Sequence, residues 1–212
     1  TFAGLIRLVA AISGIERIRF TTSHPKDMSD DLIACYGDIP KLCGQIHLPA
    51  QSGSDNVLKL MKRGYTRDSY LEKVRKLKSI RPDIAITGDI IVGFPGEDEA
   101  DFEHTLSLLE AVRYIDLFSF VYSARPGTRA AELDDTLSRT RKLARLDRLI
   151  EVQKRITREI SQTYVGSVQK IMVEGEGKLS GQVSGKADFG RIVNFTGGSS
   201  LIGSFADPAR SW

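Results

Sequence analysis

The chain has 212 residues, of which 41% are apolar, enough for one large domain or for a medium domain followed by a small one. Its longest apolar run is far shorter than a membrane span, and its first residues lack the features of a signal peptide. Its two cysteines, Cys35 and Cys43, can build neither a disulfide framework nor a CxxC metal knuckle. We therefore expect a soluble protein of the reducing cytoplasm that does not contact membranes.

Positive charge is concentrated in one segment. The net charge is +3, yet residues 139–170 hold nine Lys and Arg against three Asp and Glu, which leaves the rest of the chain negative. Such a local excess is typical of a surface that contacts phosphates, and a solvated helix face produces the same pattern. Both interpretations are open from the charge alone.

Helical and extended patterns alternate in the first two thirds of the chain. Apolar residues at helical spacing cover residues 1–13 and end at Gly14. Further helices are predicted after the cap candidate Thr66 and after the acidic turn at 97–99. Apolar runs with strand character lie at 18–21, 44–48, 84–92 and 117–122.

Strands that alternate with helices form a parallel sheet, and the residues that follow such strands meet at one edge of it. The predicted strands are too few for a closed barrel of eight, so the sheet is either open or the remainder of a larger one. The segment from Thr136 to Tyr164 then forms one long basic helix. Residues 165–212 contain short Val, Ile and Phe runs separated by Gly and Ser, which predicts a small antiparallel barrel or sandwich.

Four groups of polar residues follow the predicted strands and should converge in space. Caps and turns use the same residue types, so any one group alone has an ordinary structural explanation. We expect neither a nucleophile triad nor a metal site, because Ser52 lacks the elbow motif and His24 and His47 lack partners at metal-ligand spacing. The four groups are Thr22, Ser23 and His24; Gln51 and Ser52; Asp89 through Glu97; and Tyr122 and Ser123.

Longer strings carry a more specific signal: ERIRFTTSHPKDMSDDLI (16–33), IHLPAQSGSDNVLKLMKRGYTRDSYLEKV (46–74), GDIIVGFPGE (88–97) and FVYSARPGTRAA (120–131). Together they resemble the MiaB-type tRNA methylthiotransferases, and the resemblance runs to about residue 206. It implies an α/β fold: the C-terminal part of a radical-SAM (β/α) partial barrel, followed by a small all-β TRAM barrel. The implied division is 1–150 for the radical-SAM part, 151–160 for the rest of the connecting helix and 161–212 for the TRAM domain.

The activity that the resemblance implies is the transfer of sulfur to tRNA. Enzymes of this family use S-adenosylmethionine and two 4Fe-4S clusters to insert sulfur at C2 of N6-isopentenyl-adenosine, next to the anticodon, and then methylate that sulfur. The cluster ligands are a CxxxCxxC motif and three cysteines of an N-terminal domain, and neither set occurs in this chain. We therefore expect a monomeric fragment of the enzyme that is inactive alone. The alternative is a stand-alone RNA-binding or scaffold protein without catalysis.

The resemblance also assigns cofactor contacts. Gln51, Arg63 and Asp89 would hold the ribose hydroxyls and the methionyl carboxylate of S-adenosylmethionine, with Ser52 next to Gln51. Tyr122 and Ser123 would border the adenine. The chemistry agrees, because amides and carboxylates pair with hydroxyls and a guanidinium forks onto a carboxylate.

In the TRAM region, the resemblance implies RNA contacts from Lys186, Arg191, Asn194 and Phe195. Stacking and phosphate contact are the expected interactions, and a place in the barrel core is the alternative for Phe195. The family's closing strand should follow GSFAD, whereas this chain ends in ADPARSW, so we expect the barrel to be incomplete at its C-terminus.

Overall fold

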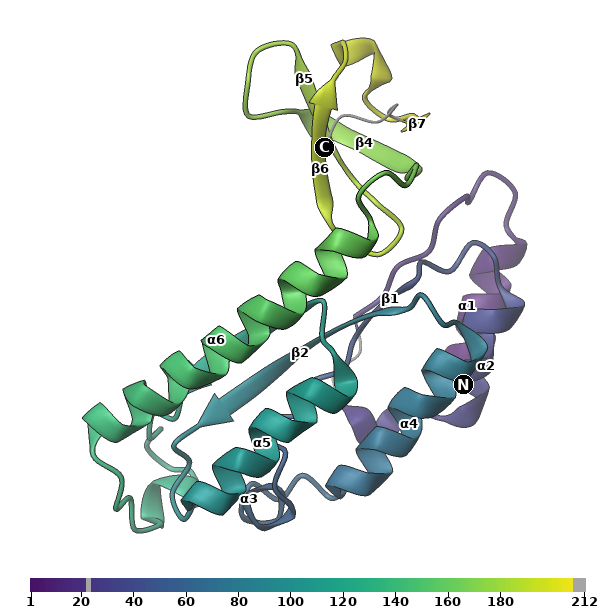
Figure 1. Ribbon diagram of the computed structural model, residues 1–212. Coiled ribbons are helices and arrows are strands. Elements are labelled where there is room, and N and C mark those ends of the chain that lie inside the picture. Colours follow the sequence, from purple (N-terminus) through teal and green to yellow (C-terminus); the bar gives the residue numbers. More distant parts are fainter. Residues whose placement is uncertain (22–23, 208–212) are drawn as a thin grey trace.

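The computed structural model describes residues 1–21 and 24–207 (Figure 1). Thr22 and Ser23, two of the candidate residues, lie outside the described residues. The chain forms an α/β part and a small antiparallel sheet, and the long helix α6 connects them (Figure 1). None of the described helices is long and apolar enough to cross a membrane.

The helices begin where their capping residues stand. Thr66 caps α4 in a capping box with Ser69, as predicted, and Asp98 caps α5 in the same way with Asp101. Ser138 caps α6, whose 25 residues make it about 37 Å long. The helices are α1 (Phe2–Ala11), α2 (Asp30–Asp38), α3 (Asp55–Leu60), α4 (Arg67–Ile80), α5 (Glu99–Val112) and α6 (Arg139–Thr163).

The α/β part is built on a parallel sheet in the order β1-β2-β3, formed by Gln45–His47, Ala85–Val92 and Asp116–Val121. Ile86, Ile90 and Val92 of β2 are buried in the same apolar core as residues of α4, α5 and α6. The other face of the sheet is open: Phe118 and Phe120 of β3 are 56% and 51% exposed. We call this surface the open face.

The predicted strand at 18–21 is wrong. Only one bridge forms there, between Ile18 and Leu42. The neighbouring side chains explain the difference, because Arg17 and Arg19 both donate to backbone carbonyls in and next to the strands of the C-terminal part. The segment therefore serves the junction between the two parts of the chain and does not extend the parallel sheet.

The C-terminal part is an antiparallel sheet in the order β6-β5-β4-β7. The short Val, Ile and Phe runs separated by Gly and Ser predicted such strands. Within 165–207, β6 and β7 are the two edges of this sheet and do not pair with each other. Residues 208–212 lie outside the described residues. The strands are β4 (Ile171–Glu176), β5 (Gln182–Lys186), β6 (Ile192–Thr196) and β7 (Phe205–Ala206).

The C-terminal sheet docks against the beginnings of the parallel strands. The Asp188 carboxylate accepts hydrogen bonds from the Gly44 N–H at 2.8 Å and from the Arg81 guanidinium at 2.7 Å. Tyr164, at the end of α6, stacks on Phe189 with ring centroids 4.1 Å apart. The docking site is therefore at the opposite end of the strands from the edge where the candidate cofactor residues were predicted.

Candidate functional site

Gln51 lies after β1 in the chain and beside β2 in space. Its N–H donates to the Asp89 carbonyl at 2.8 Å, and its own carbonyl accepts from the Ile91 N–H at 2.9 Å. Its φ is 67°, a left-handed conformation that is strained for a residue with a side chain. Such strain is concentrated at ligand clamps and active sites, which makes Gln51 a strong candidate contact residue.

Asp89 lies on the open face of the sheet beside His47. The His47 Nε2 is 3.4 Å from Asp89 Oδ2, and its Nδ1 is 3.0 Å from Thr87 Oγ1. Thr87 and Asp89 share a face because alternate residues of a strand point the same way. The His47 ring is therefore held between a hydroxyl and the carboxylate, and its edge faces Phe118. Sequence reasoning treated His47 as structural and missed this contact, although the alternation along 87–89 signals it.

Arg63 is joined to the same edge through a tyrosine. Its Nε donates to the Tyr65 hydroxyl at 3.3 Å, and that hydroxyl donates to the Ala50 carbonyl at 2.8 Å. The ring of His24 packs edge-on against Tyr65 with centroids 5.4 Å apart. Burial, and then the positive charge of Arg63, lower the pKa of His24. Gln51, Asp89 and Arg63 are thus gathered by β1, β2 and the loop after α3.

The loop between β2 and α5 is clamped by a buried ion pair. Glu97 accepts from the Gly93 N–H at 2.9 Å and from the Arg145 guanidinium at 2.6 Å. Arg145 also donates to the Glu97 carbonyl. Burial raises the pKa of Glu97, against the hydrogen bonds that favour its charged form. Sequence reasoning placed Glu97 at this edge, but the partner on α6 is too distant along the chain for local spacing to reveal.

Tyr122 and Ser123 follow β3. The Tyr122 N–H donates to the Val92 carbonyl, and Lys142 lies over its ring at 5.3 Å from the centroid. Its hydroxyl is buried and has no hydrogen-bond partner among the residues that the structure describes. Ser123 is exposed beside it. A buried hydroxyl without a partner is costly unless something else satisfies it.

Ser52 is placed differently from its neighbour Gln51. It is 1% exposed, and its hydroxyl lies 3.3 Å from Thr105 Oγ1 and accepts from the Ser54 N–H. This hydroxyl therefore fixes the start of α3 against α5 and has no surface for a cofactor. Cys35 and Cys43 are 0% and 1% exposed, and burial raises the pKa of both thiols. They do not suit an iron–sulfur cluster, which needs deprotonated cysteines.

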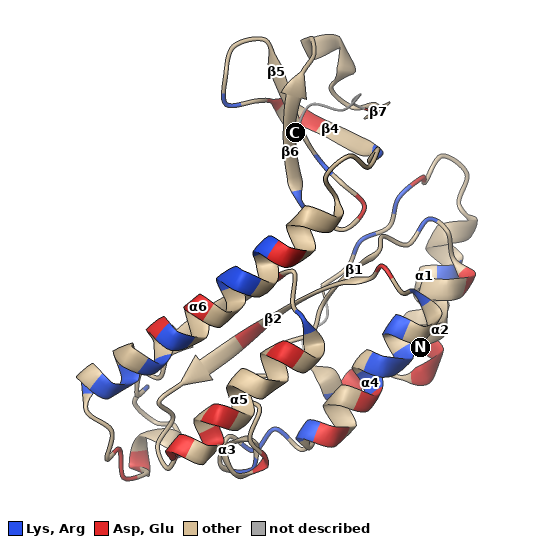
Figure 2. Cartoon of the chain, in the orientation of Figure 1, with Lys and Arg blue, Asp and Glu red and all other residues tan. Residues whose placement is uncertain are grey.

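The positive charge of α6 divides into two sets. Figure 2 shows Lys and Arg along the whole helix, with acidic residues on the neighbouring α5. One set forms ion pairs with carboxylates of α5 and the adjacent loops: Lys142, Arg145, Arg148 and Arg155. The second set is exposed and forms no ion pair with any described residue: Arg139, Arg141, Lys154 and Arg158. Part of the basic segment thus stabilises the fold, and part remains available.

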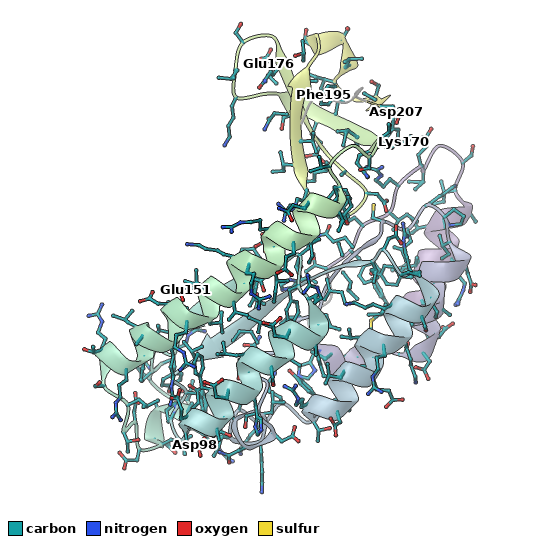
Figure 3. All side chains as sticks on the ribbon, in the orientation of Figure 1. Asp98, Glu151, Lys170, Glu176, Phe195 and Asp207 are labelled. Atoms are coloured by element: carbon teal, nitrogen blue, oxygen red, sulfur yellow. The ribbon has the colours of Figure 1, made fainter. Side chains whose placement is uncertain are left out.

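The candidate RNA residues of the C-terminal sheet lie on different sides of it. Lys186 and Asn194 belong to the outer side, with Lys186 3.5 Å from Glu174. Arg191 donates to the Ile115 carbonyl at 3.3 Å. Phe195 is 8% exposed and packs in the sheet's apolar core, which Figure 3 shows within the C-terminal sheet. Its ring therefore offers little surface on which a base could stack.

Known proteins match both parts of the chain. Residues 2–109 match the radical SAM superfamily, and residues 162–207 match the TRAM domain. Over 98% of its length the chain is 68% identical to the tRNA-2-methylthio-N(6)-dimethylallyladenosine synthase of Pelobacter propionicus, and 59% identical to that of Geobacter sulfurreducens. It spans 47% and 46% of those two relatives.

A solved structure shares the fold. The coproporphyrinogen III oxidase HemN of Escherichia coli, a radical SAM enzyme, aligns with 73% of this chain and 36% of its own at a TM-score of 0.56. The sequence identity is 18%, so this likeness concerns the fold alone. The resemblance of the motifs to MiaB-type proteins is confirmed by the high-identity relatives, and the chain belongs to the radical SAM superfamily.

Proposed function

We propose that this chain is the cofactor-holding and RNA-binding portion of a tRNA methylthiotransferase. Its substrate would be tRNA with N6-isopentenyl-adenosine next to the anticodon, modified at C2 in the cytoplasm by a monomeric enzyme. The observation that carries the proposal is the group of Gln51, Arg63 and Asp89 at one edge of a radical-SAM sheet. The proposed domain division is 1–150 for the radical-SAM part, 151–160 for the rest of the connecting helix and 161–212 for the TRAM domain.

The residues fit S-adenosylmethionine in three respects. Gln51 is strained at the edge, the Asp89 carboxylate faces the open side, and the Tyr122 hydroxyl has no partner within the described chain. When bound, S-adenosylmethionine supplies the radical and methyl-transfer chemistry. The residues do not fit an iron–sulfur cluster, because the two cysteines are buried and unsuited to hold one.

The roles of the side chains follow from their donors and acceptors. Asp89 would accept hydrogen bonds from the ribose hydroxyls, and Gln51 would add an amide contact beside it. Arg63, steadied by Tyr65, would form a charged fork with the methionyl carboxylate. Tyr122 and Ser123 would border the adenine. These residues would bind and orient the cofactor.

RNA binding is proposed for polar residues of the TRAM domain that lie outside its apolar core. Lys186 and Asn194 can reach phosphates and bases from the outer side of the sheet. Arg191 contributes charge at the junction with the α/β part. Phe195 is left out of this role because its ring is in the core.

The proposal is tested in the gene product that contains this chain. Nucleosides from tRNA of a strain that lacks the gene, complemented with the wild type, should contain 2-methylthio-N6-isopentenyl-adenosine by mass spectrometry. Asp89→Asn and Arg63→Gln should each weaken cofactor binding by about 1.5 to 3 kcal/mol, because a charged hydrogen bond is lost.

The matched control is Asp116→Asn, which removes an exposed carboxylate from the first residue of β3, opposite Thr87 in the sheet. It should leave cofactor affinity unchanged. Absence of the methylthio nucleoside after complementation with the wild type would favour the stand-alone RNA-binding alternative. Unchanged cofactor affinity in both site variants would refute the assignment of these residues.

A further inference from the structure

Two of the unpaired basic residues of α6 lie close to the TRAM domain. Lys154 and Arg158 are four residues apart, so they share one face of the helix. Both are exposed, and both lie in the last three turns, which lead directly to the C-terminal sheet. Neither forms an ion pair with a residue that the structure describes.

Arg191 of the TRAM domain lies beside the same turns. The Ile115 carbonyl accepts a hydrogen bond from the Thr157 hydroxyl at 3.1 Å and another from the Arg191 guanidinium at 3.3 Å. Thr157 stands between Lys154 and Arg158 in the sequence, so the shared acceptor places Arg191 against this stretch of α6. We call Lys154, Arg158 and Arg191 the junction patch.

The local charge of the junction patch is not cancelled by nearby pairs. Glu159, the acidic residue next to Arg158, is bound to Arg113 and Arg155 on the side toward α5. Glu151 lies one turn before Lys154 on the outer side of α6 and is exposed (Figure 3). It marks the boundary of the patch, because Asp147, one turn further from Lys154 on the same helix face, is also acidic and exposed.

We propose that the junction patch is a contact surface for the phosphates of RNA. The inference rests on the proposed function and deepens it, because it extends the RNA-binding surface from the TRAM domain onto α6. Solvated Lys and Arg without acidic partners suit a polyanion, since their charge is available for phosphate contact. The helix α6, about 37 Å long, runs from the TRAM domain to the loops after β2 and β3, and the patch lies at its TRAM end.

Two double variants with the same change in charge test the proposal. Lys154→Gln/Arg158→Gln removes the helix residues of the junction patch, and Arg148→Gln/Arg155→Gln removes two residues of the same helix that pair with α5. Filter binding of a labelled tRNA transcript to this chain is measured over a series of NaCl concentrations. Both variants reduce the net charge by two, so the long-range field is matched.

We expect only the first variant to lose tRNA affinity and salt dependence. Each phosphate contact contributes about 0.7 to 0.9 to the log-log salt slope, so the slope should flatten by roughly 1.4 to 1.8 and the affinity at low salt should fall roughly tenfold. The second variant should keep the wild-type slope and show a lower thermal midpoint, because its lost charges were paired. Glu151→Gln should strengthen binding.

Equal slopes for the two double variants would overturn the inference, because only net charge would then matter. A wild-type slope in Lys154→Gln/Arg158→Gln would overturn it as well, while the proposed function would stand. If the wild-type chain shows no salt-dependent binding of tRNA, the RNA-binding part of the proposed function fails together with the patch. The nucleoside assay of the gene product still tests the cofactor site separately.

Discussion

Burial decides what single residues of this chain can do. Gln51 and Ser52 are neighbours in the chain. The backbone of Gln51 is strained at an open edge, whereas the side chain of Ser52 is buried between α3 and α5. A resemblance between motifs assigns both to the cofactor, and only the fold separates them. The two cysteines show the same effect, because both are buried, Cys35 within the apolar core of the α/β part.

The buried thiols give a direct prediction. Because burial raises the pKa of Cys35 and Cys43 above the ordinary value, both remain protonated at pH 8 and unreactive in the folded chain. Mass spectrometry after brief iodoacetamide treatment should find no alkylation in buffer and two alkylated cysteines in 6 M guanidinium. Rapid modification of either cysteine in the native chain would contradict the enclosed positions.

At the scale of elements, the local patterns predicted well and the distant pairings did not. The Thr66 cap and the buried run of β2 follow from neighbouring residues, and both are confirmed. The strand predicted at 18–21 is wrong because Arg19, and Arg17 just before it, donate to carbonyls 153 to 169 positions later, which no local pattern records. The same holds for the pairing of Glu97 with Arg145, which fixes the loop after β2 against α6.

That ion pair should dominate the stability of its loop. The Glu97 and Arg145 side chains are 1% and 8% exposed, so Glu97→Ala leaves a buried guanidinium without its main partner and should cost about 3 to 5 kcal/mol. Glu99→Ala removes a carboxylate that is 62% exposed and should cost at most about 1 kcal/mol. Urea unfolding of the two variants compares them. Equal losses would mean that the burial of the pair has no energetic consequence.

The raised pKa of Glu97 has a signed effect on stability. A carboxyl whose folded pKa exceeds its ordinary value holds its proton more tightly in the folded state, so its contribution falls as pH rises through the raised pKa. The free energy of unfolding of the wild type should therefore decline relative to Glu97→Gln as pH rises above about 4.5. Denaturant unfolding of both proteins between pH 4 and pH 7 measures the difference, and the opposite trend would show that Arg145 outweighs burial.

At the scale of the whole molecule, the two proposed binding regions lie at opposite ends of the parallel strands. The residues proposed for the cofactor lie within β2 or after the strands, whereas the TRAM domain docks where the strands begin (Figure 1). The motifs identify both domains, but the sequence contains no sign of their relative placement. That placement depends on polar contacts such as Asp188 with Arg81 and Gly44, which join residues more than 100 positions apart.

The docking contact can be tested with two aspartates that approach the same arginine. Asp188 accepts from Arg81 and from the Gly44 N–H across the junction, whereas Asp83 lies 3.6 Å from the Arg81 Nε within the α/β part and is 76% exposed. Asp188→Ala should weaken docking by about 1 to 3 kcal/mol, because a charged hydrogen bond and a backbone bond are lost together. Calorimetry should then resolve an earlier transition for the TRAM domain, while Asp83→Ala keeps the wild-type profile. If both variants unfold as the wild type does, the apolar contacts around Tyr164 and Phe189 hold the domains together, and the polar clamp only sets their register.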